Sequence, residues 1–337
     1  MKIAYDAKRY FHNSRGLGNY SRDVVRLVQT FAPDWEISLI DKTGLSRSFM
    51  RVPNCDIYHG LSGELPFACH RKYKTVVTIH DAIFIRYPEL YSPTYRWLFT
   101  QKVKYACRVA DLIIAISEQT KRDLVNFFHA DESKIRVVYQ GCNNRFRESI
   151  TNEQIANVKK QYGLPDRYLL DVGAIEPRKN LKNLIKAIHE AKMDIPLVAI
   201  GGKSKYALQC NALAEELGVH LVLRHDIPFT DFPAIYKGAQ ALCYPSVFEG
   251  FGIPILEAMC VGTPVLTSTG SCFAETGGEA ALYADPYNPS QIGEQLQRIL
   301  TDEFLRQQMV EKGYKQADKF TDEEVAANLI EAYHSVL

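Results

Sequence analysis

The sequence is organised around residues 241–260, which read ALCYPSVFEGFGIPILEAMC. Ala241 to Tyr244 is typical of a short buried strand, and Ile253 to Cys260 is typical of a helix with a proline in its first turn. Between them, Gly250 and Gly252 allow the backbone to approach a ligand closely and to expose its N–H groups. A strand, a glycine loop and a helix N-terminus in this order predict an α/β domain with an anion-binding edge.

Two carboxylates accompany this loop. Glu249 lies on the loop itself, and Glu257 lies about one turn inside the predicted helix. A site with several N–H donors and two carboxylates favours a ligand that has an anionic centre and hydroxyls at both ends, and a sugar nucleotide has this form. The structural alternative is that Glu249 caps the helix and that Glu257 interacts with the helix dipole.

Composition and charge bound the class of protein. A chain of 337 residues with 46% hydrophobic residues has room for two well-packed domains, and a net charge of +1 gives no general reason to expect a nucleic-acid partner. The eight cysteines are dispersed without a Cys-x-x-Cys pair, which indicates reduced core thiols. The first residues are too polar for a signal peptide and no apolar run is long enough for a bilayer, so we expect a soluble, cytoplasmic protein.

Strands and helices alternate along the whole chain. In the first half we expect strands at Lys2 to Asp6, Glu36 to Ile40, Asp56 to Tyr58, Thr75 to Ile79, Leu112 to Ile116 and Ile135 to Val138. In the second half we expect them at Tyr168 to Val172, Leu197 to Ile200, Leu221 to Leu223, Ala241 to Tyr244 and Pro264 to Thr267. This alternation predicts doubly wound parallel sheets with helices on both faces, where ligands bind at the carboxyl ends of the strands.

The polar segment Gln140 to Glu148 predicts the domain boundary. We therefore expect a first domain over residues 1–145 and a second domain over 146–321. A capping box that begins at Thr321 opens a last helix over 322–337. The apolar stripe of this helix fits packing on the first domain and fits packing on the second domain equally well.

A glycine-containing segment follows the first strand. Gly16 and Gly18 precede a helix predicted from about Asn19 to Phe31. A dinucleotide-binding fingerprint would have a third glycine where Ser21 stands, and a shorter loop, so a nicotinamide dehydrogenase is disfavoured. What remains is a glycine loop that opens a helix and is suited to close approach by a ligand or by another domain.

The loop after the first strand of the second domain reads Gly173-Ala-Ile-Glu-Pro-Arg-Lys-Asn180. It brings Arg178 and Lys179 beside a helix that begins near Leu181, with Asn180 as the predicted cap. Two cations together with a helix dipole at the end of a strand predict a diphosphate site. The alternative interpretation of the two cations is a solvated basic turn.

Together these two loops make the chain similar to the retaining glycosyltransferases of family 4. The segment Glu249 to Glu257 matches the E-x7-E motif of that family, and Gly173 to Asn180 matches its second motif. Weaker matches follow in the family's order over nearly the whole chain: Gly16 to Tyr20, His80-Asp81, Ser117 to Thr120, Gly262 to Val265, and Ala284 to Pro286. The resemblance implies the GT-B fold, in which two Rossmann-like domains face a cleft.

The resemblance also implies roles in the second domain. Lys179, with Arg178 near it, would neutralise the donor diphosphate, where charge grows as the sugar leaves. Glu257 would bind ribose hydroxyls, and Glu249 would bind hydroxyls of the transferred sugar. The remaining donor contacts would come from the loop residues Gly250, Phe251 and Gly252. Ala174 departs from the family, since many members have an arginine there.

The resemblance implies that His80 of the first domain lies near the donor sugar. His80 would be a catalytic residue together with Lys179 and Glu249 of the second domain. Asp81 and His59 are assigned to the acceptor side. Asp81 would orient His80 or cap a helix, and the alternative for His59 is a structural role. Gly16 and Gly18 match the family's glycine loop near the diphosphate, although Asn19 stands where many members have arginine.

The resemblance implies that the loop between Leu221 and Phe232, which includes Ile227, recognises the donor base. Backbone contacts would read the base there, so the sequence leaves GDP-linked and UDP-linked donors open. No clustered carboxylate or histidine pattern indicates a metal site, and no cofactor beyond the nucleotide sugar is implied.

The expected function is therefore a retaining hexosyltransferase. It would move a mannose- or glucose-type hexose from a nucleotide-diphosphate sugar to a glycan or a lipid-linked acceptor, without a metal, in the cytoplasm or in peripheral contact with the inner face of the membrane. The resemblance favours front-face substitution over a covalent glycosyl-enzyme. The alternatives are a sugar-nucleotide 2-epimerase and a non-catalytic nucleotide-sugar binding protein.

Overall fold

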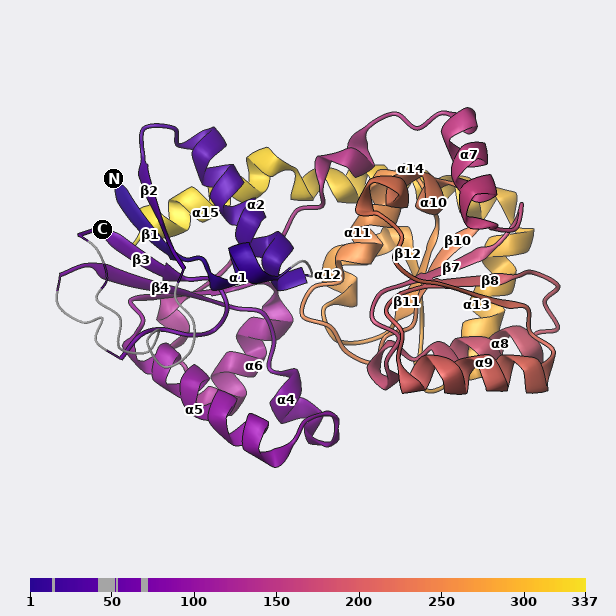
Figure 1. Ribbon diagram of the computed structural model, residues 1–337, viewed down its shortest axis with the longest axis horizontal. Coiled ribbons are helices and arrows are strands. Elements are labelled where there is room, and N and C mark those ends of the chain that lie inside the picture. Colours follow the sequence, from indigo (N-terminus) through magenta and orange to yellow (C-terminus); the bar gives the residue numbers. More distant parts are fainter. Residues whose placement is uncertain (14–15, 42–51, 53, 68–71) are drawn as a thin grey trace. The chain divides into compact units, whose positions relative to one another are not determined.

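The structure is a computed structural model, and it describes residues 1–13, 16–41, 52, 54–67 and 72–337. The chain folds into two compact units (Figure 1). One consists of Met1–Gln140 together with Phe320–Leu337, and the other consists of Gly141–Lys319. The predicted boundary after residue 145 lies a few residues inside the second unit.

The first unit contains a parallel sheet of six strands in the order β2-β1-β3-β4-β5-β6. The strands are β1 (Lys2–Asp6), β2 (Glu36–Ile40), β3 (Ile57–Gly60), β4 (Lys74–Ile79), β5 (Leu112–Ala115) and β6 (Ile135–Val137). The central strands are buried on both faces, which is why they consist of continuous apolar runs. The strand order reverses between β1 and β3, so their carboxyl ends form the switch point where such sheets bind ligands.

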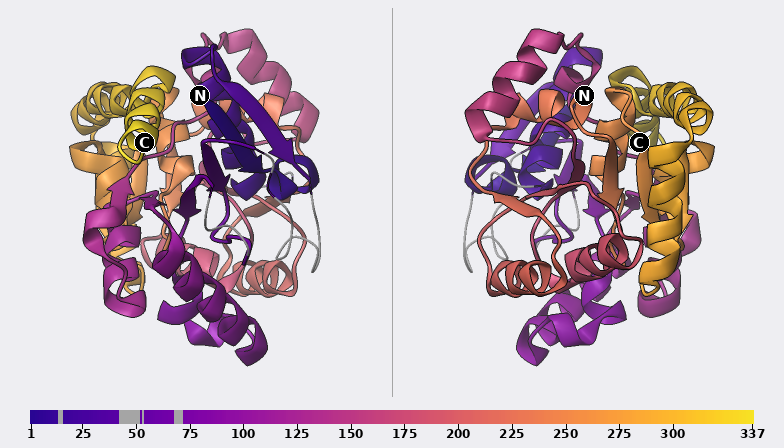
Figure 2. Two further views of the ribbon diagram at one scale, coloured as in Figure 1. Left: turned by 90° about the vertical axis from the view of Figure 1, so that its left-hand side faces the viewer. Right: turned by 90° about the vertical axis from the view of Figure 1, so that its right-hand side faces the viewer.

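Helices cover both faces of this sheet (Figure 1). One face carries α1 (Lys8–His12), α2 (Gly16–Phe31) and α15 (Asp322–His334), and the other carries α4 (Ile83–Arg86), α5 (Pro93–Val109) and α6 (Glu118–Phe128). Two short 3-10 helices, η1 (Pro88–Leu90) and η2 (Glu132–Lys134), complete the unit. Figure 2 shows α5 at the outside of this unit. Ser117 caps α6, because its side chain accepts the N–H of Thr120.

The last helix, α15, belongs to the first unit, which the sequence had left open. It packs on α2, and Arg26 and Asp322 form an ion pair of 2.5 Å between the two helices. Inside the unit, the hydroxyl of Tyr333 lies 2.7 Å from Nδ1 of His59 and 3.2 Å from the hydroxyl of Tyr5. The end of the chain therefore completes the core around its own first strand.

The second unit contains a parallel sheet of six strands in the order β12-β11-β10-β7-β8-β9. The strands are β7 (Leu169–Val172), β8 (Leu197–Ile200), β9 (Leu221–Arg224), β10 (Ala241–Tyr244), β11 (Val265–Ser268) and β12 (Ala281–Ala284). The strand β12 was not predicted from the sequence, because it is an edge strand of four residues that is only partly buried. The switch point lies between β7 and β10, and both loops singled out in the sequence follow these two strands.

Helices also cover both faces of the second sheet (Figure 1). One face carries α8 (Leu181–Glu190), α9 (Lys205–Leu217) and α13 (Pro289–Thr301), whose buried side chains include Leu184, Ile188 and Leu296. The other described α-helices of this unit are α7 (Asn152–Tyr162), α10 (Phe232–Lys237), α11 (Ile253–Cys260), α12 (Phe273–Gly277) and α14 (Glu303–Ala317). The 3-10 helices are η3 (Asn144–Arg147), η4 (Pro177–Lys179), η5 (Phe229–Asp231), η6 (Gly278–Ala280) and η7 (Asp318–Phe320).

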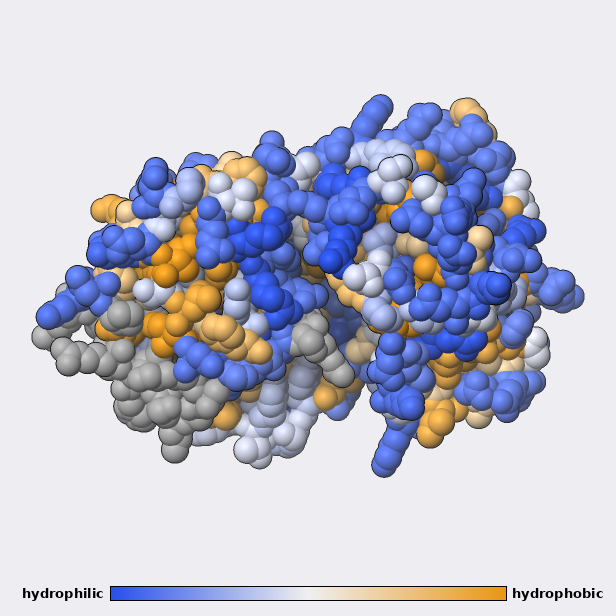
Figure 3. Space-filling model, turned by 45° about the horizontal axis from the view of Figure 1, so that its top comes forward, coloured by the Kyte–Doolittle hydropathy of each residue, from blue (hydrophilic) through white to orange (hydrophobic). Residues whose placement is uncertain are grey.

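The surface is polar over most of the face drawn in Figure 3, with apolar side chains in patches among the polar ones. Among the residues that the structure describes, no helix is both long enough and apolar enough to cross a bilayer.

Candidate active site

The loop after β7 begins with a close approach of two backbones. Gly173 has φ = 142°, a conformation that side chains rarely adopt. A Cβ atom on Gly201, which follows β8, would lie only 2.0 Å from the carbonyl oxygen of Gly173. The two glycines therefore let the loops after β7 and β8 pack directly against each other.

Asn180 ends this loop, but it does not cap α8 as predicted. The side chain of Asn180 makes no capping hydrogen bond, and its backbone is left-handed with φ = 64°. Its amide instead donates to the carbonyl oxygens of Pro245 at 3.1 Å and Pro286 at 2.6 Å. Asn180 thus ties together the loops that follow β7, β10 and β12, because an amide reaches partners that a local cap does not.

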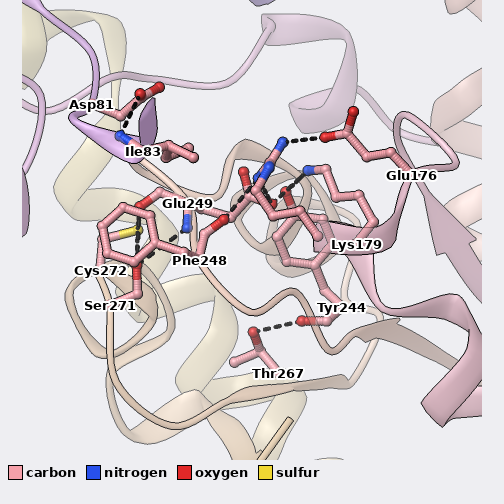
Figure 4. Close-up of polar contacts among 11 residues, drawn as sticks. Asp81, Ile83, Glu176, Lys179, Tyr244, Phe248, Glu249, Thr267, Ser271 and Cys272 are labelled. Atoms are coloured by element: carbon pink, nitrogen blue, oxygen red, sulfur yellow. Dashed lines mark hydrogen bonds and ion pairs between the residues drawn. The ribbon is translucent and has the colours of Figure 1, made fainter. Parts of the chain in front are cut away.

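Lys179 and Arg178, on the loop after β7, both pair with Glu249, which lies on the loop after β10. Figure 4 shows Lys179 and Glu249. Nζ of Lys179 donates to Oε1 of Glu249 at 2.6 Å and to the hydroxyl of Tyr244 at 2.7 Å. The Arg178 guanidinium lies 2.7 Å from the same Oε1 and donates to the carbonyl oxygen of Phe248 at 2.7 Å. The side chains of Lys179 and Arg178 are only 11% and 14% exposed, so the interpretation of the two cations as a solvated turn is wrong.

Opposite charges control the protonation of this cluster. Burial opposes ionisation of Glu249, but Lys179 and Arg178 outweigh it and hold the pKa of Glu249 at about 2. Arg178 has a second ion pair with Glu176, whose side chain is 43% exposed. Burial raises the pKa of the nearby Asp171 to about 7, and Lys179 opposes that rise. The two cations thus lie in a nearly dry place, where they act strongly on any further negative charge.

The backbone of Glu249 is held from the opposite side of the loop (Figure 4). Its N–H donates to Oγ of Ser271 at 3.2 Å, and the Ser271 hydroxyl donates to the carbonyl oxygen of Glu249 at 3.0 Å. Further along, the Thr276 hydroxyl donates to the carbonyl oxygen of Phe251 at 2.5 Å. Gly252 is the N-cap residue of α11 with φ = 98° and has no side chain to cap the helix, while the Glu249 carboxylate is paired with Arg178 and Lys179. The capping alternative for Glu249 is therefore wrong.

Glu257 lies on α11 and is buried. Its Oε2 accepts a hydrogen bond of 2.7 Å from the hydroxyl of Tyr236 on α10. Burial raises the pKa of Glu257 to about 7, although the hydrogen bond from Tyr236 opposes the rise. The Glu257 carboxyl therefore changes protonation near neutral pH. Its assigned contact with ribose remains a prediction.

His80 follows β4 in the first unit and is half-buried. Its Nε2 lies 2.9 Å from the carbonyl oxygen of Leu61, and because a carbonyl only accepts, Nε2 carries the proton and Nδ1 is the acceptor. The ring of Tyr20 meets it edge-on at 4.6 Å. Burial lowers the pKa of His80 to about 4, so the ring is neutral at physiological pH. It can accept a hydrogen bond from a hydroxyl, but it does not supply a positive charge.

His59 is not available to an acceptor. The side chain is fully buried, with Nδ1 bound to Tyr333 and Nε2 lying 2.8 Å from the hydroxyl of Thr78. The acceptor-side role predicted for His59 is therefore wrong, and its structural alternative holds. The carboxylate of Asp81 accepts the N–H of Ile83, the first residue of α4, at 3.1 Å, as the helix-cap alternative expects (Figure 4).

Gly16 and Gly18 lie inside the first turns of α2, which begins at Gly16 and not near Asn19. A Cβ atom on Gly18 would lie 1.8 Å from the carbonyl oxygen of Asn13, whereas a Cβ on Gly16 would meet nothing within 4 Å. Gly18 is thus required for a close approach within its own unit. The donor contacts predicted for both glycines stay predictions.

Ile227 is half-buried in the loop that connects β9 to η5. Because β9 is the edge strand of the second sheet, this loop lies two strands away from β7. The predicted contact of Ile227 with the base remains a prediction.

Several residues that shape the site were not predicted from the sequence. Tyr244 binds Lys179, Tyr236 binds Glu257, and Ser271 holds the backbone of Glu249. Tyr244 had one signal, since it ends a strand whose loop was already singled out. Tyr236 had none, because it meets Glu257 only through the packing of α10 beside α11.

Within the described ranges, no group of three or more His, Cys, Asp or Glu side chains is arranged to hold a metal ion. Independence of a metal remains a prediction.

Two family models match the chain. The model described as Glycosyltransferase Family 4 matches residues 5–145, and the model described as Glycosyl transferases group 1 matches residues 154–316. The chain is also 30% identical over 284 residues to O-antigen chain mannosyltransferase B of Escherichia coli, a match that covers 82% of this chain and 74% of that protein. The chain therefore belongs to the family 4 glycosyltransferases.

Other relatives agree with this class. An uncharacterized glycosyltransferase of Methanocaldococcus jannaschii is 27% identical over 361 residues, covering 99% of this chain and 88% of that one. The serotype-specific mannosyltransferase WbdA of Escherichia coli is 28% identical, but the match spans only 34% of its length.

Solved structures show the same fold. The sucrose-phosphate synthase of Thermosynechococcus elongatus superposes with a TM-score of 0.79 at 17% identity, covering 100% of this chain and 99% of that one. HepE of Anabaena, in complex with UDP and glucose, gives a TM-score of 0.78 at 16% identity, covering 99% and 100%. The fold is GT-B, and the protein is a glycosyltransferase.

Proposed function

We propose that this glycosyltransferase is a retaining hexosyltransferase that moves a mannose- or glucose-type hexose from a nucleotide-diphosphate sugar to a glycan or lipid-linked acceptor. The observation that carries the proposal is the convergence of Lys179 and Arg178 on the buried carboxylate of Glu249 at the switch point of the second sheet. Several relatives are named as mannosyltransferases of O-antigen chains, which supports a hexose as the transferred group.

In the proposed reaction, the bond between the sugar and the diphosphate breaks and negative charge grows on the diphosphate. Lys179 and Arg178, which are only 11% and 14% exposed, stabilise this charge. Glu249 binds hydroxyls of the sugar while its own ion pairs keep it ionised. Glu257 binds the ribose, and Tyr236 orients its carboxyl group.

The nucleotide preference is the first test. Thermal unfolding would be followed with GDP, UDP, ADP, GDP-mannose and UDP-glucose, because a ligand that binds the folded state raises Tm according to its affinity. We expect a GDP- or UDP-linked pair to stabilise the protein and ADP to do so least. Transfer from the preferred radiolabelled donor to isolated membrane glycolipids then tests catalysis, and tight binding without hydrolysis or transfer would contradict the proposal.

We propose retention by front-face substitution, in which the departing diphosphate accepts the proton of the acceptor hydroxyl. The expected product has the same anomeric configuration as the donor, and NMR of the product measures this. Trapping of a covalent glycosyl-enzyme with a fluorinated donor would contradict the front-face step. We also propose that no metal takes part, so activity in EDTA should equal activity without it.

A lipid-linked acceptor would require contact with a membrane, and we propose that α5 makes this contact with an anionic bilayer. Trp97 is 65% exposed and Leu98 is 43% exposed on this helix. The helix contains four cations and no carboxylate, and the cations are Arg96, Lys102, Lys104 and Arg108. Exposed tryptophan beside cations is typical of helices that lie in the interface of anionic membranes.

Co-sedimentation with vesicles tests this contact. The wild-type protein should bind phosphatidylglycerol vesicles and bind pure phosphatidylcholine vesicles much less, because the cations attract anionic headgroups. The double variant Trp97→Ser/Leu98→Ser should lose at least fivefold of this binding, whereas Leu208→Ser, which changes a 71%-exposed leucine of the second unit, should not. Equal binding by all three proteins would contradict the assignment of α5.

A further inference from the structure

Two buried cysteines of the second unit lie in contact although they are far apart in the sequence. The Sγ atoms of Cys142 and Cys260 are 3.0 Å apart across 118 residues of chain. Both residues are buried, with exposed fractions of 4% and 8%. The other described cysteines are also free and buried, at positions 55, 107, 210, 243 and 272. The contact between Cys142 and Cys260 therefore places two thiols where one covalent bond would join them.

This pair connects the beginning of the second unit to the helix that carries Glu257. Cys142 comes just before η3, and η3 packs on α11, the helix that Cys260 ends. The ring of Phe146 in η3 meets the ring of Tyr236 edge-on at 5.4 Å, and Tyr236 is the hydrogen-bond donor to Glu257. Cys260 follows Glu257 by three residues, which is about one helical turn. Whatever moves the pair therefore moves the surroundings of Glu257.

The surroundings of the pair distinguish the two sulfurs, because the pKa of Cys260 is lowered and that of Cys142 is raised. The positive charge of Arg147 acts on both sulfurs, and this arginine is held by a 2.6 Å hydrogen bond to the carbonyl oxygen of Ala317. Either sulfur can donate in the hydrogen bond between them, and this bond and Arg147 lower the pKa of Cys260, while burial and the carboxylate of Glu257 oppose the shift. A cysteine of lowered pKa in contact with a second thiol has the resolving partner that converts a sulfenic acid to a disulfide.

We propose that Cys142 and Cys260 form a modification site at which a hydroperoxide produces a reversible disulfide. The Cys260 thiolate attacks the hydroperoxide, the O–O bond breaks, and the departing oxygen leaves as water or an alcohol after it takes a proton. The resulting sulfenic acid is attacked by the sulfur of Cys142, the S–S bond forms, and its hydroxyl leaves as water with the proton of Cys142. Two thiols and one hydroperoxide thus give one disulfide, one water or alcohol from the first step, and one water from the second.

The disulfide has a structural consequence. A disulfide bond is about 2.05 Å long, so the sulfurs must approach each other by about 1 Å, which draws η3 and the end of α11 together. Cross-linking across 118 residues restricts the unfolded chain strongly. Oxidation should therefore raise the Tm of the protein. If the proposed ribose contact of Glu257 is correct, oxidation should also change the affinity for the preferred nucleotide at least threefold.

The first experiment treats the full-length, reduced protein with hydrogen peroxide and maps its peptides without reduction. We expect a peptide pair joined between Cys142 and Cys260 that has lost two hydrogens, a rise in Tm of roughly 5 °C or more, and reversal of both by dithiothreitol. Absence of the joined pair, with sulfinic acid formed instead, would overturn the proposal.

Variants keep the test specific. Cys142→Ala and Cys260→Ala should each abolish the Tm rise, and Cys210→Ala, which changes another buried cysteine of the same unit, should retain both the joined pair and the rise. A Tm rise in Cys142→Ala would overturn the assignment. A joined pair that leaves nucleotide affinity unchanged would refute the link to Glu257, and an absence of nucleotide binding in the reduced protein would refute the proposed function while leaving the disulfide standing.

Discussion

Two glutamates of the second unit show how neighbours determine the state of a side chain. Glu249 and Glu257 are both buried, but the pKa of Glu249 is held at about 2 and that of Glu257 is raised to about 7. The difference follows from their partners, because Glu249 faces two cations and Glu257 faces a tyrosine hydroxyl. Glu249 is therefore ionised at any physiological pH, whereas Glu257 titrates within the physiological range.

Lys179→Ala should lower kcat/KM for the preferred donor by about 10²- to 10³-fold, because the loss of one charged donor in a dry site costs a few kcal/mol in the transition state. The control is Lys186→Ala, which changes an exposed lysine of α8. Circular dichroism should show that both variants are folded. Transfer rates equal to those of the wild type would remove Lys179 from the diphosphate site.

Glu257→Gln should stabilise the protein at alkaline pH. The folded-state pKa of about 7 lies above the ordinary value of 4.5, so the folded protein holds an extra proton between these values and its stability falls as pH rises through this window. Glutamine carries no charge, so the variant should be more stable than the wild type at pH 8, by up to about 3 kcal/mol, and equal to it near pH 4.

Urea titrations at pH 4 and pH 8 measure this difference, with Glu190→Gln on the exposed side of α8 as the control. The stabilised variant should bind nucleotide more weakly, since it loses a charged acceptor for ribose hydroxyls. A stability gap that is the same at both pH values would mean that titration of Glu257 is not its cause.

At the scale of the elements, the loops after the strands are positioned by close backbone contacts. Gly201 packs on the carbonyl of Gly173, and Gly18 packs on the carbonyl of Asn13. Asn180 joins three loops through one amide. These contacts let short loops hold Lys179 in place without a long connecting segment.

Gly18→Ala and Gly16→Ala form a matched pair within α2. A methyl group on Gly18 would meet the carbonyl oxygen of Asn13 at 1.8 Å, so Gly18→Ala should lower the free energy of unfolding by about 1–3 kcal/mol. A methyl group on Gly16 meets nothing within 4 Å, so Gly16→Ala should be neutral or slightly stabilising.

Thermal unfolding of both variants tests this contrast. A similar loss of stability in the two would contradict the close approach at Gly18. A loss of donor affinity in Gly16→Ala without a loss of stability would support the predicted donor contact of that glycine.

At the scale of the whole molecule, the last helix returns to the first unit. Tyr333 joins α15 to strands β1 and β3 through Tyr5 and His59, across 328 and 274 residues of sequence. Burial lowers the pKa of His59 to about 3, so the imidazole is neutral and uses both nitrogens in hydrogen bonds to hydroxyls. The chain therefore closes its first unit only when its final helix is in place.

Tyr333→Phe should destabilise the protein by about 1–3 kcal/mol, because it leaves a buried nitrogen of His59 and the hydroxyl of Tyr5 without this partner. Tyr287→Phe, at a tyrosine that is 64% exposed, is the control and should change stability little. Urea unfolding of the full chain measures both. An unchanged midpoint for Tyr333→Phe would show that the network adds little to closure.

The sequence pattern was enough to predict the two parallel sheets, all but one of the described strands, and the loops that carry Lys179 and Glu249. These features follow from apolar runs, glycines and helix-start residues, which act over a few neighbouring positions. The tertiary structure alone decided that α15 completes the first unit, that Asn180 joins loops, that His59 is buried, and that Cys142 meets Cys260. Each of these depends on contacts between residues far apart in the chain, and local pattern carries no information about such partners.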